Sequence, residues 1–294
     1  MKKIITIILL FSIFIFSCSK STSNSNSINI GLSVSTLNNP FFVALSQGAK
    51  DKAKELNVNL IIVNASDDTA KQASDIEDLI SKNVQVIIVN PVDSDAAAPA
   101  AEDAIAANIP IISLDRAING VEVNAQISSD NVAGAKIAGE YLIELVGNDA
   151  KVAELIGIPG ASATIDRGKG FHQAVDNKLN IAAMQTANFN RAEGLTVMEN
   201  ILQANPDIKG VFAHNDEMAL GALEAVKAAG KDIAVIGFDA TDDALLAIKD
   251  GAMKATVAQQ PSLMGAMAVE TAIKIINSEE VDKYIPVEVS LIKE

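Results

Sequence analysis

The sequence predicts an α/β protein built from two doubly wound parallel-sheet lobes. Three observations indicate this fold class. Short β-branched runs alternate with helical stretches, the runs recur about every 25–30 residues, and the whole pattern restarts after Asp130. A chain of 294 residues also suits two lobes of roughly 100–150 residues each.

The first half contains four of these runs. They lie at Ile28–Val34, Val58–Val63, Val86–Val89 and Ile109–Ile112. Each is largely apolar on successive residues, as expected for a strand that helices cover on both faces. A helix is predicted over Phe42–Leu56, with Asn39 as its cap and Pro40 at the first helical position. Strands separated by helices in this way are typical of parallel βαβ units.

The second half repeats the alternation. Its expected elements are a helix at Asn131–Gly147, strands at Val152–Ile156, Gly210–Ala213, Ile233–Ile236 and Ala255–Ala258, a last helix at Ser262–Asn277 and an extended tail at Tyr284–Ile292. No Ser-, Gly- or Pro-rich linker divides the halves, so we expect ordered hinge segments between them.

The N-terminus is predicted to be an export signal over residues 1–17. A basic start is followed by the mostly apolar run Ile4–Phe16, which is shorter than the ~20 residues of a membrane-spanning helix. The only cysteine, Cys18, ends a segment, Ile15–Cys18, that resembles the lipobox of bacterial lipoproteins. This implies a lipidated Cys18 and a polar tether over 18–27, with ordinary signal cleavage nearby as the alternative. We expect an exported protein, periplasmic or on the cell surface, that the lipid alone attaches to a membrane.

The composition excludes several classes of function. A formal charge of −14 repels phosphate backbones, so nucleic acid is not an expected partner. Two histidines and one cysteine are too few for a zinc or iron–sulfur site, and we expect no metal and no cofactor. His172 and His214 are expected to be ordinary polar residues. A single cysteine makes no disulfide within the chain, so packing must stabilise the fold.

Polar and aromatic residues gather where the predicted strands end. Ligands of open parallel sheets bind beyond the carboxyl ends of the strands. The candidate ligand contacts are Ser35, Asn39, Phe41, Phe42, Asn90, Asp115, Arg116, Arg167, Phe189, Asn215, Phe238, Asp239 and Gln259. Phenylalanine is sparse in this chain, and we expect the four in this set to lie in loops and to line a pocket.

These residue types suit a neutral, polyhydroxylated ligand. Asp115 and Asp239 can accept hydroxyl protons, while the two arginines and the amides can donate to ring and hydroxyl oxygens. Phenylalanine rings can cover the C–H faces of a sugar. Each residue also has a purely structural explanation: asparagines as caps or turns, Asp115 and Arg116 as a surface pair, phenylalanines as core. Their recurrence at strand ends in both halves favours a binding site.

Five segments carry a family resemblance that extends from about Ile28 to Ile292. They are Ser35–Phe42 (STLNNPFF), Asn90–Ala96 (NPVDSDA), Leu114–Arg116 (LDR), Asn215–Ala222 (NDEMALGA) and Gly237–Asp239 (GFD). With these segments the sequence resembles the sugar-binding periplasmic proteins of bacterial ABC transporters, and among them those that bind D-ribose. The resemblance implies a type I periplasmic binding protein, whose two lobes are joined by a three-segment hinge and enclose the sugar.

The resemblance also implies roles for the candidate residues. Phe41, Phe42 and Phe189 would contact the sugar ring, Ser35 would line the cleft, Phe238 would lie beside it, and the other candidates would hydrogen-bond the hydroxyls. The expected lobes are 28–129 with 260–288, and 130–259 with 289–294. We expect a monomer that hands D-ribose, or a related neutral sugar, to an ABC permease. A chemoreceptor is left open as a further partner.

Three alternatives remain at this stage. Another sugar such as allose or galactose, or a furanosyl signalling molecule, would keep the role and change the ligand. An enzyme could use Asp115 and Asp239 as an acid/base pair, but no G-x-G-x-x-G follows the first strand and no Walker-type lysine loop occurs. The sensing half of a transcriptional repressor would need a DNA-binding headpiece where the export signal stands. We therefore expect a binding protein that catalyses no reaction.

Overall fold

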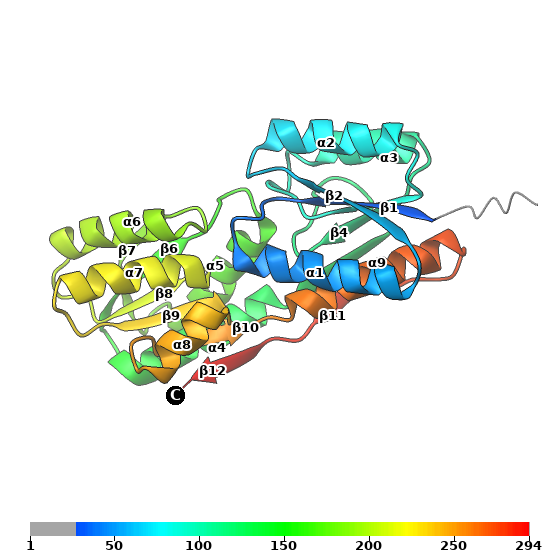
Figure 1. Ribbon diagram of the computed structural model, residues 1–294. Helices are drawn as coiled ribbons and strands as arrows, with labels where there is room; N and C mark the ends of the chain where they lie inside the picture. The colour runs from blue at the N-terminus through cyan, green and yellow to red at the C-terminus, as the bar shows by residue number, and fades with distance from the viewer. Residues whose placement is uncertain (1–27, 294) are drawn as a thin grey trace, which may run out of the picture.

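The computed structural model describes residues 28–293, which form two lobes side by side (Figure 1). Each lobe contains one six-stranded sheet between layers of helices, which confirms the expected fold class. The predicted signal, Cys18 and the tether lie outside the described residues. Within 28–293, no helix combines the length and the apolar character that crossing a bilayer requires.

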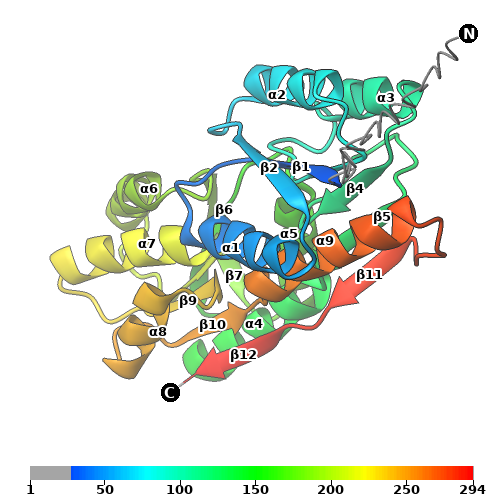
Figure 2. The ribbon, with the colours of Figure 1, turned by 45° about the vertical axis from the view of Figure 1, so that its right-hand side comes forward.

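The first sheet has the strand order β11-β5-β4-β3-β1-β2, with all neighbours parallel. Its elements are β1 (Asn29–Val34), α1 (Pro40–Glu55), β2 (Asn59–Asn64), α2 (Thr69–Ser81), β3 (Val86–Val89), α3 (Ala98–Ala106), β4 (Ile111–Leu114), β5 (Ala125–Ser129), α9 (Pro261–Ile276) and β11 (Tyr284–Val287). Helices α1 and α9 lie side by side on one face (Figure 2), and α2 and α3 cover the other. Successive strand residues therefore pack in opposite layers: Ile88 against α1 and α9, and Ile87 against α2 and α3.

The second sheet has the order β12-β10-β9-β8-β6-β7, and only β12 is antiparallel to its neighbour. Its elements are α4 (Asn131–Val146), β6 (Lys151–Ile156), α5 (Ser162–Val175), β7 (Asn180–Thr186), α6 (Arg191–Ala204), β8 (Gly210–Ala213), α7 (Asp216–Ala228), β9 (Ala234–Asp239), α8 (Asp242–Lys249), β10 (Ala255–Ala258) and β12 (Ser290–Lys293). Phe212 packs towards α4 and α5, whereas its neighbour Val211 packs towards α6 and α7. Both sheets are thus buried on two faces, as parallel sheets require.

The chain passes between the lobes after β5, after β10 and between β11 and β12. The tail expected as one extended segment, Tyr284–Ile292, is divided there: β11 joins the first sheet and β12 the second. These passages are bonded to one another. The N–H of Asp130 donates to the carbonyl of Val287 at 3.3 Å, and Nε2 of Gln260 donates to the carbonyl of Glu288 at 3.2 Å. They form the ordered hinge that the absence of a flexible linker predicted.

The sequence did not predict the strands β5 and β7, and it placed β4 two residues too early. The edge strand β7 is half-exposed and carries polar residues, so it lacks the continuous apolar run of a buried strand. Strand β5 is short and ends in two serines. The run expected at Ile109–Ile112 forms β4 two residues later, because Pro110 lacks the N–H that a central strand needs.

Candidate functional site

A small cavity lies between the lobes, at the carboxyl ends of strands from both sheets. It contains about 230 Å³ of empty space, part of which is open to solvent. Its lining consists of Asn39, Phe41, Phe42, Asp115, Arg116, Ala163, Arg167, Phe189, Asn215, Asp239 and Gln259. A space of this size suits one small molecule.

The structure brings the sequence-predicted residues together at this cavity, except for Ser35, Asn90 and Phe238. Those three are fully buried behind the lining. Ala163 is the lining residue that sequence analysis missed, because an alanine in a helix carries no signal of a site. Ala163 is the second residue of α5, and the start of this helix lies at the cavity wall.

The expectation that the aromatic candidates lie in loops was wrong for three of the four. Phe41 and Phe42 belong to the first turn of α1, because the helix begins at Pro40 directly after its cap. Phe238 lies inside β9 and packs in the core. Only Phe189 lies between elements, and its φ of 59° is in the left-handed region.

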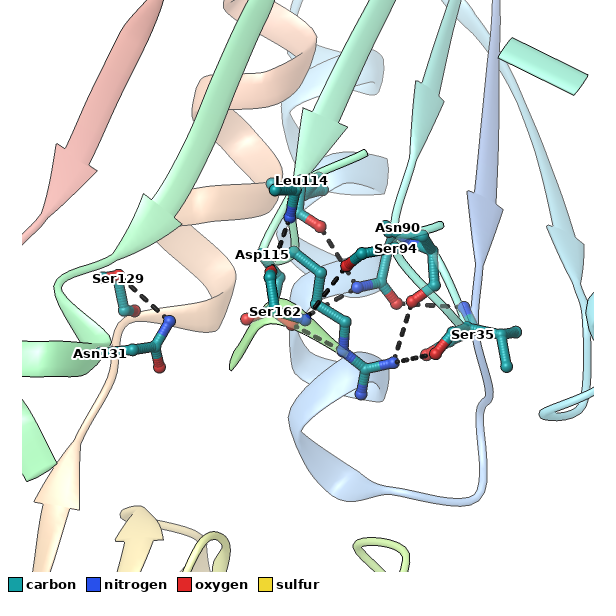
Figure 3. Close-up of polar contacts among 12 residues, drawn as sticks. Ser35, Asn90, Ser94, Leu114, Asp115, Ser129, Asn131 and Ser162 are labelled. Carbon is teal, nitrogen blue, oxygen red and sulfur yellow. Dashed lines mark hydrogen bonds and ion pairs between the residues drawn. The ribbon is translucent and has the colours of Figure 1, made fainter. Parts of the chain in front are cut away.

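Asn90 joins the ends of three strands in the first lobe (Figure 3). Its Oδ1 accepts a hydrogen bond from the N–H of Ser35 at 3.0 Å. Its Nδ2 donates to the carbonyl of Leu114 at 3.2 Å and to Oδ2 of Asp115 at 3.4 Å. Asp115 has a φ of 66°, a conformation that aspartate tolerates better than most residues. Asn90 therefore positions the Asp115 carboxylate from behind the cavity.

Arg116 lies between aromatic rings of the two lobes. Its guanidinium carbon is 5.2 Å from the ring centroid of Phe42 and 5.3 Å from that of Phe189, within cation–π range. Its Nη1 donates to the carbonyl of Pro91 at 2.9 Å, and its Nε lies 3.6 Å from Oδ2 of Asp115. The side chain is thus fixed on the first lobe while it contacts the second.

Arg167 is the corresponding cation of the second lobe. Its Nε donates to Oδ1 of Asn131 at 2.8 Å, and its Nη1 donates to the carbonyl of His214 at 2.5 Å. The guanidinium carbon lies 3.9 Å from the ring centroid of Phe238. Nη1 is also 3.9 Å from Oδ1 of Asp239. Phe238 therefore acts as the support of Arg167, which explains why it is behind the lining.

Asp239 ends β9 in an unusual conformation. Its φ of 127° is rare for a residue with a side chain, and such strain is found at ligand clamps. Nε2 of Gln259 donates to Oδ1 of Asp239 at 2.6 Å. A third carboxylate, that of Asp216, lies deeper and accepts from the hydroxyl of Thr256 at 2.6 Å and from the N–H of Thr241 at 2.8 Å.

Two asparagines of the lining also cap helices, so the structural explanation for them is correct. Oδ1 of Asn39 accepts from the N–H of Phe41 at 2.9 Å at the start of α1. Oδ1 of Asn215 accepts from the N–H of Met218 at 3.0 Å at the start of α7. Nδ2 of Asn215 also donates to the carbonyl of Phe189 at 3.3 Å. Since both side-chain oxygens accept from the helices, each asparagine offers a ligand the amide N–H groups that are not already bonded.

Burial shifts the pKa of the two carboxyl groups and the two guanidinium groups that line the cavity. It raises the pKa of Asp115 and places the pKa of Asp239 well above its usual value, although the neighbouring arginines lower both. It lowers the pKa of Arg116 and of Arg167, against the effect of the carboxylates. Two carboxylates and two guanidiniums balance in charge, which favours a neutral ligand over an ion.

Three buried polar atoms at the cavity have no hydrogen-bond partner among the described residues. They are Oδ1 of Asp115, Nε of Arg116 and Oε1 of Gln259. Buried polar groups of folded proteins are nearly always paired, and this set contains two acceptors and one donor. A ligand with several hydroxyl groups can satisfy both kinds. In the part of the chain that the structure describes, no three His, Cys, Asp or Glu side chains cluster so as to hold a metal ion.

A buried network behind the site joins the two histidines. Glu154 is 1% exposed, with Oε1 2.8 Å from Nε2 of His214 and Oε2 3.2 Å from Nε2 of His172. Nδ1 of His172 lies 2.9 Å from Oδ1 of Asp176. Burial alone lowers the pKa of His172, but the hydrogen bond to Asp176 and the charge of Glu154 outweigh it and raise the pKa. Protonated His172 therefore compensates the buried Glu154 carboxylate, beneath the carbonyl that holds Arg167.

We expect the protein to lose stability as the pH rises above about 6.5, through the raised pKa of His172. A histidine whose pKa is higher in the folded chain stabilises it fully below the unfolded value, and that contribution disappears as the folded group loses its proton. Thermal unfolding between about pH 6 and pH 9 tests this in the wild type and in His172→Gln. The wild-type Tm should fall more steeply with pH than that of the variant; parallel curves would exclude the role of His172.

The two lobes and the polar cavity between them define a binding protein that encloses a small ligand. The chain belongs to the periplasmic binding protein family: a family model described as "Periplasmic binding protein domain" matches residues 30–280. Membership implies export, and it makes the chain a substrate-binding protein rather than an enzyme.

Relatives and solved structures agree on this family. "Ribose import binding protein RbsB" of Bacillus subtilis (strain 168) is 52% identical over 254 residues, which cover 86% of this chain and 83% of the relative. The protein of the same name from Escherichia coli (strain K12) is 49% identical over 263 residues, 89% of each chain. The crystal structure of an ABC transporter periplasmic solute binding protein from Actinobacillus succinogenes with bound D-allose has a TM-score of 0.85 and 36% identity, covering 90% of this chain and 97% of the other.

Proposed function

We propose that this protein captures D-ribose between its two lobes and delivers it to the permease of an ABC transporter. The cavity carries the proposal: it has the volume of one small molecule, a balanced set of two carboxylates and two guanidiniums, and unpaired buried donors and acceptors. The names of relatives at 52% and 49% identity favour ribose as that molecule.

Capture would work by lobe closure. Asp115 and Arg116 belong to the first lobe, and Arg167 and Asp239 to the second, so a sugar in the cavity bonds to both at once. Because those bonds form together only when the lobes are closed, the sugar binds the closed form better and shifts the population towards it. The moving bodies we propose are 28–129 with 260–288, and 130–259 with 289–294. The permease would recognise the closed arrangement of their surfaces.

The ring of the sugar would lie against phenylalanines. Phe41 and Phe42 form an edge-to-face pair with centroids 5.1 Å apart in the first lobe, and Phe189 comes from the second. Aromatic faces cover C–H groups, while the polar lining takes the hydroxyls. Another sugar remains the second candidate, since a structural neighbour at 36% identity holds D-allose.

We further propose that Cys18 is lipidated, so that residues 18–27 tether the binding domain to a membrane. The proposal rests on the lipobox-like segment Ile15–Cys18 and on the polar sequence that follows it. Metabolic labelling with a fatty acid tests it: Cys18→Ser should abolish the label. We also propose that the protein is a monomer and that a chemoreceptor is a further partner.

Isothermal titration with D-ribose, D-allose, D-galactose and D-xylose tests the ligand. We expect D-ribose to bind with the highest affinity, at one site per chain. If another of these sugars binds more tightly than D-ribose, the proposed transport role stands and that sugar replaces D-ribose as the proposed ligand. If none of the four sugars binds, the proposal that the cavity binds a monosaccharide is refuted.

A further inference from the structure

The lobes also touch outside the sugar cavity, through the segment 91–97 after β3 and the segment 157–161 between β6 and α5. The N–H of Ser94 donates to the carbonyl of Gly160 at 2.9 Å. In return, the N–H of Ser162 donates to Oγ of Ser94 at 3.0 Å (Figure 3). Ser94 is 0% exposed, whereas Gly160 and Ser162 are half-buried. Two segments of different lobes are thus joined by a reciprocal pair of hydrogen bonds.

A third bond strengthens this contact. Oγ of Ser162 accepts from the N–H of Ala117 at 2.8 Å, and Ala117 follows β4 in the first lobe. Ser162 therefore connects the second lobe to two separate segments of the first. Neither Ser94 nor Ser162 lines the sugar cavity or lies in a passage between the lobes. Their contacts depend on closure, because opening at the hinge carries the two lobes apart.

The backbone of Gly160 approaches the first lobe so closely that no side chain fits. A Cβ at Gly160 would lie 1.6 Å from Oδ2 of Asp93 and 2.5 Å from its Cγ. The carboxylate cannot turn away freely, because its Oδ1 accepts from the N–H groups of Asp95 at 2.9 Å and of Ala96 at 2.8 Å. The φ of Gly160 is outside the left-handed region. Glycine is therefore needed here for the approach of the other lobe and not for the local backbone.

We propose that Asp93, Ser94, Gly160 and Ser162 form a closure latch that sets the affinity for every sugar without touching the sugar. The proposal rests on the proposed function, since it assumes capture by closure. The latch stabilises the closed form alone, and all ligands that require this form gain the same free energy from it. A change in the latch should therefore multiply the Kd of each sugar by one common factor, whereas a change in the cavity should alter the preference among sugars.

Titration of latch variants with D-ribose and D-allose tests the proposal. Gly160→Ala should weaken both sugars by about tenfold or more and by the same factor, with an unchanged Tm of the ligand-free protein. Ser162→Ala should weaken both by roughly 2- to 10-fold, the effect of one hydrogen bond. Gly168→Ala in α5 is the matched control, because its Cβ would have no neighbour closer than 3.7 Å. It should leave both affinities unchanged.

A second substitution tests whether Gly160→Ala acts through its contact with Asp93 or through local damage to the fold. Asp93→Ala in the Gly160→Ala background removes both obstructing atoms, Oδ2 and Cγ of Asp93. It should restore most of the lost affinity. Failure to restore it, unchanged affinity in Gly160→Ala, or different factors for the two sugars would each overturn the latch.

The latch can also be tested if neither sugar binds the wild type, an outcome that would refute the proposed function. Solution X-ray scattering then compares the ligand-free proteins. The radius of gyration of Gly160→Ala should exceed that of the wild type, because the added Cβ disfavours the closed form. Equal radii would overturn the latch independently of the ligand.

Discussion

Replacing Arg167 by alanine should weaken the binding of D-ribose by at least about 100-fold in isothermal titration. The guanidinium is 3% exposed and lies 3.9 Å from a carboxylate oxygen of Asp239. Its loss removes a donor to the sugar and leaves Asp239 buried without its nearest cation. Hydrogen bonds to a charged group contribute about 1.5–3 kcal/mol each, and about 1.4 kcal/mol corresponds to a factor of ten in affinity.

Two further variants make this result specific. Arg167→Lys keeps the charge but loses the planar fork that reaches Asn131 and the carbonyl of His214, so it should recover only part of the affinity. Arg191→Ala is the matched control in the same lobe, because that guanidinium pairs with Glu217 and Asp243 and does not line the sugar cavity. An Arg167→Ala protein that is folded and binds ribose within about threefold of the wild type would refute the site.

Asp115→Asn should weaken D-ribose binding by roughly 5- to 150-fold, the equivalent of about 1–3 kcal/mol for a buried hydrogen bond left unmade. Asparagine keeps the size of the side chain and tolerates the φ of 66°, which alanine does not. The amide of the new asparagine must point its N–H groups in one of two directions. They face either Nδ2 of Asn90, which is itself a donor, or the sugar hydroxyl from which Asp115 accepts a hydrogen bond in the wild type. Either orientation loses an acceptor.

The control for this variant is Asp103→Asn, an exposed carboxylate on α3 of the same lobe. It should leave both the Kd and the Tm unchanged. The contribution of Asp115 is contradicted if Asp115→Asn retains the wild-type Kd while its unfolding transition is intact.

Burial explains which parts of the fold could be predicted. The runs at Val86–Val89 and Gly210–Ala213 form β3 and β8 with the expected bounds, since central strands of a parallel sheet are apolar at every position. Strand β7 lies at an edge, where exposed positions admit polar residues and remove that signal. The tail that divides between both sheets could not be foreseen, because its register depends on partners far away in the chain.

The position of the site could be predicted because parallel strands bring their carboxyl ends together. What each residue does there depends on distances that the sequence does not contain. Asn90 and Phe238 stand behind the cavity, as supports of Asp115 and Arg167. The bond from Arg167 to Asn131 arises from the packing of α5 against α4, and no local pattern reports it.

The central claim is that the cavity between the lobes holds D-ribose, and a crystal structure of the complex tests it most directly. The account predicts one sugar in the cavity, with hydroxyls within hydrogen-bond distance of Asp115, Arg167 and Asp239, and with the contact between Ser94 and Ser162 intact. Ribose bound elsewhere, or bound in the cavity without contact to these side chains, would contradict it.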